Sequence, residues 1–168
     1  MTNTTAKPHG VPFFVPMLNP LIARLVRSGI RLGPRRAPMV LLTIRGRKSG
    51  ASHTNPVNIF YLDGRRYVLA TFGETSWVKN IRAAGRAELT EGRRRLAVDA
   101  IELRPEEAAP IMREALTPFL RSPATAMALG RFYAVRSDAP LEDFVTEARR
   151  HAVFELRESS PEPAQPHY

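Results

Sequence analysis

The chain of 168 residues contains no cysteine. This absence excludes disulfide bonds, thiolate metal sites and a cysteine nucleophile, and it fits a reducing cytoplasm. The sequence also has no uninterrupted apolar run of the roughly 18 residues that a transmembrane helix requires, so we expect no membrane-spanning segment. Lysine is scarce: 3 of the 25 basic residues are lysine and the others are arginine.

The remaining composition is typical of one globular domain. A length of 168 residues suits a single domain with its own core, and 43% hydrophobic and 24% charged residues are ordinary values. We therefore predict one domain, 1–168. Residues 1–10 are predicted to be flexible, and the proline-rich segment 158–168 is predicted to form a disordered tail.

Positive charge is concentrated in one part of the chain. Residues 31–95 contain 14 basic and 4 acidic side chains, whereas the rest of the chain is close to neutral. The planar guanidinium of arginine suits phosphate and carboxylate groups. The excess therefore predicts an anionic partner: nucleic acid, anionic lipid, or a small ligand with phosphate and carboxylates.

Residues 17–32 are predicted to form an amphipathic helix. Apolar residues recur there at spacings of three and four, while Arg24, Arg27 and Arg31 line another face. Two roles stay open for this helix. In the first, the apolar face of the helix covers the main domain of a cytoplasmic protein. In the second, the helix docks on the anionic inner face of the cell membrane.

Short strand patterns dominate residues 38–157. Two dipeptides, Asp63-Gly64 and Glu91-Gly92, are predicted hairpin turns, so most of the sheet should be antiparallel. A helix is expected over 76–84, with Ser76 as its N-cap and Gly85 as its stop. Further helices are expected from residue 105 to 116 and in the acidic region after it. The pattern predicts an α+β fold, a small barrel of about six strands flanked by helices, with the strands at 39–44, 57–62, 67–71, 88–90, 96–103 and 152–156.

Three motifs carry the candidate chemistry. The first is Gly46-Arg47-Lys48-Ser49-Gly50, directly after the first predicted strand. Its glycines allow close approach of a ligand, and its amides and cations suit a phosphate. It is not a Walker loop, because Arg47 stands where that motif has glycine. A basic hairpin turn would have the same composition.

The second motif, His53-Thr54-Asn55-Pro56-Val57-Asn58, leads into the next strand. Pro56 lacks an amide donor, which favours a strand entrance where backbone groups meet a flat polar ring; an ordinary strand start is the alternative. No second histidine or carboxylate stands at ligand spacing from His53, so no metal site is expected.

The third motif joins a strand that ends in small residues to a helix that begins with the only tryptophan, Trp77. This arrangement forms a ledge for an aromatic ligand, with Asn80 and Arg82 directing polar groups at it. The alternative is that Trp77 plugs one end of the barrel. Because no nucleophile elbow or carboxylate pair is evident, hydrolysis is disfavoured and a redox cofactor fits better.

The ordered set of GRKSG, the Asn55-Pro56 strand entrance, the DG hairpin, YVLAT-x-G and W-x-x-N-x-R resembles one family. It is the deazaflavin-dependent nitroreductase family of mycobacteria and other actinobacteria, also called the F420H2-dependent quinone reductase family. The resemblance covers about residues 38–103. It implies a split β-barrel that binds coenzyme F420, a polyanion with a phosphate and a γ-glutamate tail, and reduces a small organic acceptor such as a quinone, enone or nitro compound.

The resemblance also implies roles for particular positions, although it identifies no catalytic residue. The phosphate and tail would be held by Arg47, Lys48 and Ser49. The deazaflavin edge would lie along His53, Thr54, Asn55, Pro56, Val57 and Asn58. Backbone contacts to the ring would come from Leu69, Ala70, Thr71 and Phe72. The pocket would be closed by Ser76, Trp77, Val78, Lys79 and Asn80.

Two departures from the family pattern affect the acceptor side. Glu74 stands where glycine would be expected. Nitroimidazole-reducing members also use a tyrosine in the helix before the last strand, where this chain has Phe144, with Tyr133 further back. Without a phenol there, protonation of a nitro group is disfavoured, and quinone-like or other conjugated acceptors are expected.

Two alternatives keep parts of this interpretation. The same barrel would hold the phosphate of FMN in place of F420. A basic barrel that binds nucleic acid ranks last, because the aromatic residues of the cationic segment lie mostly in core-like strand runs. We therefore expect a small-molecule acceptor, no nucleic-acid partner, and either a monomer or a homodimer.

Overall fold

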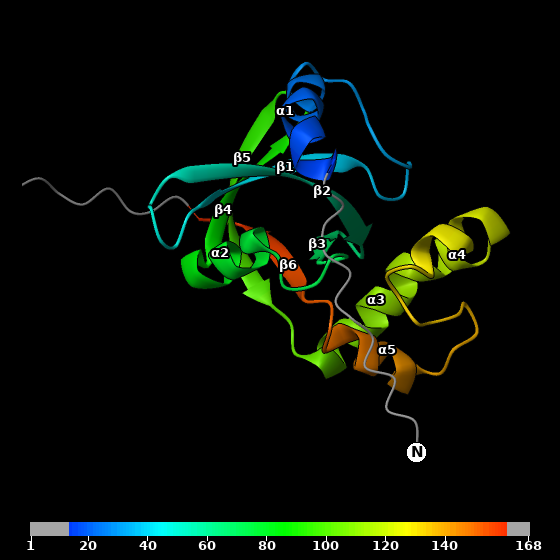
Figure 1. The fold of residues 1–168 in the computed structure, drawn as a ribbon. Helices are drawn as coiled ribbons and strands as arrows, with labels where there is room; N and C mark the ends of the chain where they lie inside the picture. The colour runs from blue at the N-terminus through cyan, green and yellow to red at the C-terminus, as the bar shows by residue number, and fades with distance from the viewer. Residues whose placement is uncertain (1–13, 161–168) are drawn as a thin grey trace, which may run out of the picture.

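The computed structural model describes residues 14–160, with side chains from residue 19 on. The predicted flexible segment 1–10, and the predicted tail beyond residue 160, lie outside the described residues. Six antiparallel strands close a barrel in the order β1-β2-β3-β6-β5-β4 (Figure 1). This confirms the predicted α+β barrel. The strands are β1 (Met39–Arg45), β2 (Ser52–Leu62), β3 (Arg65–Leu69), β4 (Arg86–Glu91), β5 (Arg94–Glu102) and β6 (Val153–Glu158).

Several strand limits differ from the prediction. β2 begins five residues early because Ser52 pairs with Arg45 of β1, so the whole second motif lies inside a strand. β3 ends at Leu69, which leaves Ala70 and Thr71 in the turn that follows. β6 reaches Glu158, which pairs with Val98 of β5, so the predicted tail start at this residue is wrong.

The two predicted hairpin turns have different outcomes. Leu62 pairs with Arg65, and both Asp63 and Gly64 have positive φ, as a two-residue type I′ turn requires. In the second hairpin, residues 91 and 94 form the last pair, so the turn consists of residues 92 and 93 and not of the predicted Glu91-Gly92. Only the glycine at 92 has positive φ there, which is the pattern of a type II′ turn.

Helix α2 (Ser76–Ala84) covers one end of the barrel, and Val78 and Ile81 are completely buried against the barrel interior. The predicted N-cap is wrong by one residue. Thr75 is extended and precedes the first helical residue, Ser76, and neither supplies a side-chain capping bond. The predicted stop is confirmed, because Gly85 adopts the left-handed conformation with φ 67°.

Replacing Gly85 by alanine is expected to lower the free energy of unfolding by about 1 kcal/mol. A Cβ at this position meets no atom within 4 Å, so the loss reflects backbone strain alone. Urea unfolding of the wild type, Gly85→Ala and Gly85→Asn measures it. Asparagine tolerates the left-handed region better than alanine and should lose less; equal losses for the two variants would contradict the explanation.

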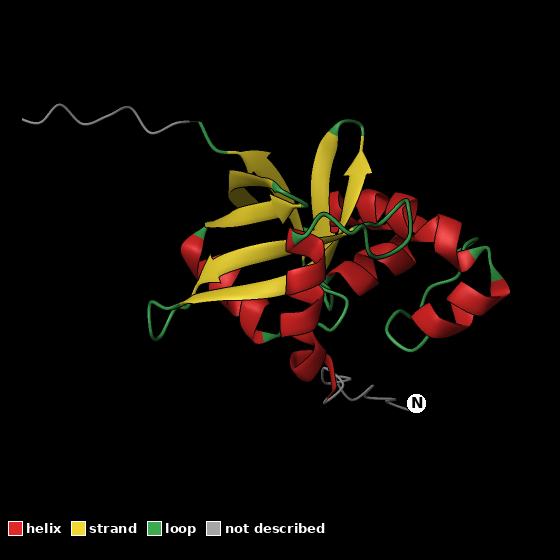
Figure 2. Ribbon diagram, turned by 90° about the horizontal axis from the view of Figure 1, so that it is seen from above, coloured by secondary structure: helices red, strands yellow, loops and turns green. Residues whose placement is uncertain are grey.

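Two apolar cores share the barrel wall. One fills the barrel interior, and the other lies between β2, β3 and the helices α3 (Pro105–Leu120) and α5 (Leu141–Ala148). Alternation along β3 explains the division, since Val68 points inward while Tyr67 and Leu69 face the helices. The short helix α4 (Pro123–Leu129) follows α3, and all three helices lie to one side of the barrel (Figures 1 and 2).

Helix α1 (Phe14–Arg27) begins and ends earlier than the predicted 17–32. It ends because Gly29 has φ 92° and its amide bonds to the carbonyl of Val26. Ala23 and Val26 are buried against Leu41 of β1, so this face covers the barrel. No helix in the described part of the chain is long and apolar enough to cross a membrane.

Candidate functional site

Two adjoining cavities share the side chain of Trp77. The polar cavity has a volume of about 300 Å³ and lies between the β1–β2 loop and the start of α2. The first motif does form the connection between the paired strands β1 and β2, and four of its five residues line this cavity. The lining consists of Gly46, Arg47, Lys48, Ser49, His53, Asn55, Ser76, Trp77 and Asn80.

The β1–β2 loop is held in place by a buried amide. The Oδ1 atom of Asn80 accepts hydrogen bonds from the backbone N of Arg47 at 3.3 Å and from its Nη1 at 2.8 Å. A Cβ at Gly46 would lie 2.9 Å from His53 Nε2 and 3.1 Å from the carbonyl oxygen of Ala51. A side chain at Gly46 would therefore push aside the His53 ring or the loop backbone, and Asn80 holds both the backbone amide and the guanidinium of Arg47.

Replacing Asn80 by alanine is expected to loosen the loop more than it harms the fold. The change leaves Arg47 without its acceptor, so we expect affinity for an anionic ligand to fall about tenfold and the free energy of unfolding to fall by about 1–2 kcal/mol. Isothermal titration and urea unfolding measure the two effects. Replacement of the exposed neighbour Lys79, which lines neither cavity, by alanine is the control. Unchanged affinity in Asn80→Ala would contradict the anchoring role.

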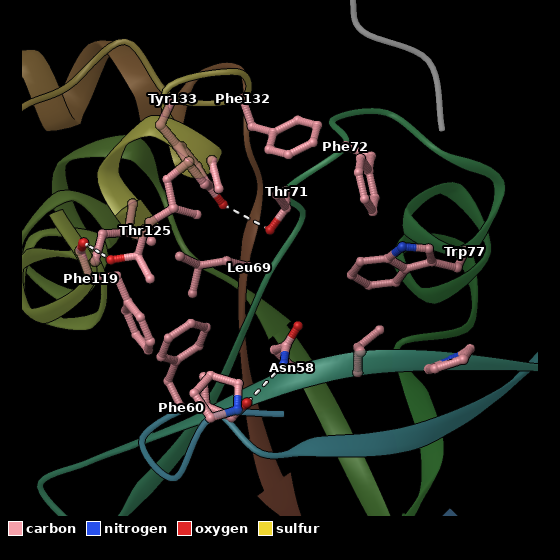
Figure 3. A pocket seen from close by; sticks show the side chains of 17 residues that line it. Asn58, Phe60, Leu69, Thr71, Phe72, Trp77, Phe119, Thr125, Phe132 and Tyr133 are labelled. Atoms are coloured by element: carbon pink, nitrogen blue, oxygen red, sulfur yellow. Dashed lines mark hydrogen bonds between the residues drawn. The ribbon is translucent and has the colours of Figure 1, made fainter. Parts of the chain in front are cut away.

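The second cavity is apolar and has a volume of about 310 Å³. It lies between the outward face of β2, the end of β3 and the helices α3 and α4 (Figure 3). Phe72 and Phe132 pack edge to face at 5.1 Å on one side, and Phe60 and Phe119 do so at 6.4 Å on another. The lining consists of Pro34, Ala37, Pro56, Val57, Asn58, Phe60, Leu69, Thr71, Phe72, Trp77, Leu116, Phe119, Thr125, Ala128, Leu129, Phe132 and Tyr133.

A pair of hydroxyl groups interrupts this apolar wall. The hydroxyl oxygens of Tyr133 and Thr71 lie 3.0 Å apart in a hydrogen bond (Figure 3). Burial raises the pKa of the Tyr133 phenol well above its ordinary value, and the nearby charge of Glu147 adds to the increase. The phenol therefore stays protonated over the physiological pH range.

The apolar cavity does contain a phenol, although the helix position compared with the family tyrosine has none. Phe144, at the position compared with the family tyrosine, is completely buried in the core between barrel and helices and does not line the cavity. Tyr133 lies in the segment between α4 and α5 and reaches the cavity from there. The predicted disadvantage for nitro acceptors therefore loses its structural reason.

Most of the predicted site residues line one of the two cavities, and the others lie elsewhere in the structure. Four of them line neither cavity: Thr54 bonds to Thr43 on β1, Ala70 and Val78 are buried in the barrel core, and Lys79 is exposed. The polar cavity contains Arg47, Lys48, Ser49, His53, Asn55, Ser76, Trp77 and Asn80, and the apolar cavity contains Pro56, Val57, Asn58, Leu69, Thr71 and Phe72 together with Trp77.

Arg82 does not direct its charge at the cavities. Its guanidinium bonds to Glu74 at 2.9 Å and to Glu102 at 2.6 Å, and the hydrogen bond to Glu74 holds the pKa of that carboxyl below its ordinary value. Glu74, the departure from the family pattern, therefore forms an exposed ion pair and lines neither cavity.

The cationic segment does not gather at one site. Of its 14 basic side chains, only Arg47 and Lys48 line the polar cavity. Strand pairing places the β4–β5 turn at the opposite end of β1 from the β1–β2 loop. A third hollow at that end is lined by four arginines of the segment, namely Arg31, Arg35, Arg93 and Arg94.

The sequence did not identify the helical wall of the apolar cavity. Those residues come from α3, α4 and the segment before α5, where an ordinary amphipathic pattern does not distinguish a cavity wall from core. The one available signal was the presence of three large aromatic side chains, Phe119, Phe132 and Tyr133, in a predicted helical region. In the described part of the chain, no group of three or more acidic or histidine side chains is placed to hold a metal ion.

Comparison with known proteins gave one family match. The sequence profile described as F420H(2)-dependent quinone reductase matches residues 23–137, which is more than half of the chain. All residues that line the two cavities lie within this range. No curated protein matched the chain.

Solved structures gave more distant similarities. One described as an F420-H2 dependent reductase is 22% identical over 73% of this chain and 95% of its own, with a TM-score of 0.42. A protein of unknown function from Agrobacterium tumefaciens is 18% identical over 92% of this chain and 60% of its own, with a TM-score of 0.49. Another, described as a domain-swapped dimer, is 20% identical over 82% and 92%, with a TM-score of 0.49.

Proposed function

Because this chain belongs to the F420H(2)-dependent quinone reductase family, we propose that it is an oxidoreductase that uses reduced coenzyme F420 to reduce a small conjugated organic acceptor. The observation that carries the proposal is the pair of adjoining cavities that meet at Trp77. One is polar and cationic, and the other is apolar with one hydroxyl pair.

The chemistry of the two cavities fits the two parts of this cofactor. The polar cavity offers Arg47, Lys48 and Ser49 to a phosphate and a carboxylate tail. Trp77 and the β2 residues from Pro56 to Asn58 offer a flat, mostly apolar surface to the ring. Gly46 keeps the loop close to His53, where any larger residue would displace the ring of the histidine.

The chain's own residues supply position and polarity. When bound, the reduced deazaflavin provides the hydride from its C5 carbon. The apolar walls exclude water and hold a planar acceptor beside Trp77. The Tyr133 and Thr71 hydroxyls lie where a carbonyl oxygen of the acceptor can receive a hydrogen bond, which stabilises the negative charge that develops on that oxygen.

Acceptor class is tested with the enzyme loaded with reduced cofactor. We expect a quinone or an enone to oxidise the reduced cofactor rapidly and a saturated ketone of similar shape to oxidise it slowly, because only the conjugated compounds accept hydride readily. Stopped-flow absorbance of the cofactor measures the rates. Equal rates for all three compounds, or no reaction with the conjugated pair, would exclude the proposed activity.

FMN is the alternative ligand for the same barrel. Its phosphate and aromatic ring would also suit the two cavities, so the geometry favours neither ligand, and family membership favours F420. The cationic excess does not discriminate between F420 and FMN, since most of it lies away from the polar cavity. Oligomeric state and a cytoplasmic location stay predictions.

We also infer that the arginine-lined hollow contacts an anionic membrane surface, which extends the alternative that the segment 17–32 docks on the membrane. The hollow combines four arginines and one carboxylate, Glu91, with two exposed side chains, Ile30 at 50% and Tyr61 at 47% exposure; the Tyr61 hydroxyl donates to Glu91. Cations beside apolar tips suit an anionic lipid interface.

Vesicle sedimentation tests the contact. We expect binding to phosphatidylglycerol vesicles that weakens with added salt, and a roughly tenfold or greater loss of binding when Arg93 and Arg94 are replaced by alanine, since each basic residue near the surface contributes about 1 kcal/mol. No binding, or equal binding to neutral phosphatidylcholine vesicles, would remove the proposal.

A further inference from the structure

The reductase chemistry described above gives no polar contact to one side chain of the apolar cavity, the amide of Asn58. Residues 56–60 of β2 alternate between the two sides of the barrel wall. Val57 and Ile59 point into the barrel, whereas Asn58 and Phe60 face outward. Asn58 is half-buried and lines the cavity. An amide in a mostly apolar wall is well placed to orient a bound molecule.

A backbone carbonyl fixes which end of this amide faces the cavity. The Nδ2 atom of Asn58 donates to the carbonyl oxygen of Ala37 at 2.8 Å. Because a carbonyl oxygen can only accept a hydrogen bond, the amide atom beside it must be the nitrogen. Figure 3 shows the other end, Oδ1, directed into the cavity. No donor in the described part of the chain is hydrogen-bonded to Oδ1.

The chain before β1 holds the amide in this orientation. Gly33 has φ 85°, and a Cβ there would lie 2.9 Å from the carbonyl oxygen of Ala37 and 3.2 Å from Nδ2 of Asn58. The amide of Ala37 in turn bonds to the carbonyl of Pro34 at 2.9 Å, so the carbonyl that anchors Asn58 belongs to a closed turn. A reversed amide would place Oδ1 against the Ala37 oxygen, so the acceptor end stays on the cavity side.

The other polar side chains of this cavity supply donors. The hydrogen bond between Thr71 and Tyr133 uses one of their two O–H groups and leaves the second free to donate. The indole N–H of Trp77 can only donate. The Thr125 hydroxyl donates to a backbone carbonyl in the last turn of α3. Among the side chains that line the cavity, Asn58 is therefore the one that presents a group able only to accept.

We propose that Asn58 is a specificity-determining residue whose Oδ1 atom accepts a hydrogen bond from a hydroxyl or N–H group of the acceptor, while the carbonyl oxygen of the acceptor lies at the Thr71–Tyr133 pair. The substrate class is then a planar conjugated carbonyl compound that carries a hydrogen-bond donor. An acceptor without a donor would displace water from Oδ1 and leave it unpaired, which lowers kcat/KM. This role rests on the reductase function proposed above.

The deazaflavin ring also carries a donor, its imide N–H, but the position of Asn58 favours the acceptor. His53 and Asn55, earlier on β2, line the polar cavity, whereas Asn58 lines only the apolar one. Three residues of strand place Asn58 about 10 Å further along β2 than Asn55. Oδ1 therefore lies away from the groups offered to the phosphate and tail, and beside the wall offered to the acceptor.

A pair of quinones tests the preference with the enzyme loaded with reduced F420. A hydroxymethyl-substituted naphthoquinone carries a donor and its methyl ether does not, while the CH2 spacer keeps the two rings similar in electron demand. Wild-type kcat/KM should be roughly tenfold higher for the alcohol than for the ether. In Asn58→Leu, which keeps the approximate shape and removes the polar atoms, this ratio should fall to about one, and the dissociation constant of F420 should stay within about twofold.

Thr125→Val is the matched control, because it removes another hydroxyl from the same cavity without changing Asn58. Its alcohol-to-ether ratio should equal the wild-type ratio. A ratio that falls to about one in both variants would trace the preference to the general polarity of the cavity and overturn the role of Asn58.

The remaining outcomes separate this proposal from the reductase function. Equal kcat/KM for the alcohol and the ether in the wild type would overturn the role of Asn58 and leave the reductase function standing. That comparison needs no variant, so it decides even if Asn58→Leu, which also loses the bond to Ala37, does not fold. An unchanged ratio in Asn58→Leu together with weaker F420 binding would assign Oδ1 to the imide N–H of the cofactor and overturn the proposal as well.

If neither quinone oxidises the reduced cofactor, the reductase function fails and binding still tests Asn58. Quenching of Trp77, the only tryptophan and part of the cavity wall, measures the dissociation constants of the two quinones in the cofactor-free protein. The alcohol should bind roughly tenfold more tightly than the ether to the wild type, and the two should bind alike to Asn58→Leu. Equal binding of both quinones to the wild type would overturn the proposal.

Discussion

Replacing Arg47 and Lys48 together by alanine is expected to raise the dissociation constant of F420 on the order of a hundredfold, because each cation contributes about 1.5 kcal/mol to a charge-assisted contact with phosphate or carboxylate. The fold should persist, since both side chains belong to a loop outside the cores. Fluorescence titration of the cofactor measures the change, and its salt dependence should become shallower with two fewer charges.

A matched double variant separates local contact from overall charge. Arg113→Ala with Arg149→Ala removes the same two charges from exposed positions that line neither cavity. Its affinity should stay within about twofold of the wild type, since exposed charges beyond a Debye length are largely screened. If both double variants lose affinity alike, the effect is one of net charge and the assignment of the loop is wrong.

Replacing Tyr133 by phenylalanine is expected to lower kcat/KM for the acceptor about a hundredfold and to leave F420 affinity unchanged. Burial holds the phenol protonated, and when the Thr71 hydroxyl donates the hydrogen bond between the two groups, the O–H of Tyr133 is free to donate to an acceptor oxygen. Loss of this bond should lower the free energy of unfolding by only about 1 kcal/mol.

Tyr67→Phe is the control for that experiment. Tyr67 is buried in the same core between barrel and helices but lines neither cavity, so its hydroxyl should not affect the rate. A Tyr133→Phe enzyme with the wild-type kcat/KM for a quinone would show that the hydroxyl pair makes no contact with the reacting oxygen. Stopped-flow oxidation of the reduced cofactor, with each variant and two acceptors, makes the comparison.

Local chemistry made the barrel predictable. Alternating strand patterns and the Asp63-Gly64 turn follow from backbone geometry, and Gly85 ends its helix because glycine tolerates positive φ. The position of the β1–β2 loop and the place of Trp77 at the start of a helix were predictable for the same reason. Each follows from a short, continuous stretch of sequence: a basic loop between two glycines, and a tryptophan at the beginning of a helical pattern. Element ends were less predictable, because pairing partners such as Ser52 with Arg45 extend strands beyond their apolar runs.

The acceptor side depends on contacts between distant segments and was not predictable in detail. Tyr133 meets Thr71 across 62 positions of the chain, whereas the comparison with the family tyrosine in the helix before the last strand pointed to Phe144. The clustering of positive charge along the sequence did not predict where these charges lie in the structure. Residues 31–95 form one cationic block, but antiparallel strands carry its arginines to opposite ends of the barrel.

A paired titration with coenzyme F420 and with FMN, at two salt concentrations, tests whether the two adjoining cavities form a binding site for F420. The signals are ligand fluorescence and the emission of Trp77, the only tryptophan, which lies between the two cavities. The account predicts tight, salt-sensitive binding of F420 with quenching of Trp77 and much weaker binding of FMN. Tight binding of FMN alone, or of neither ligand, would contradict it.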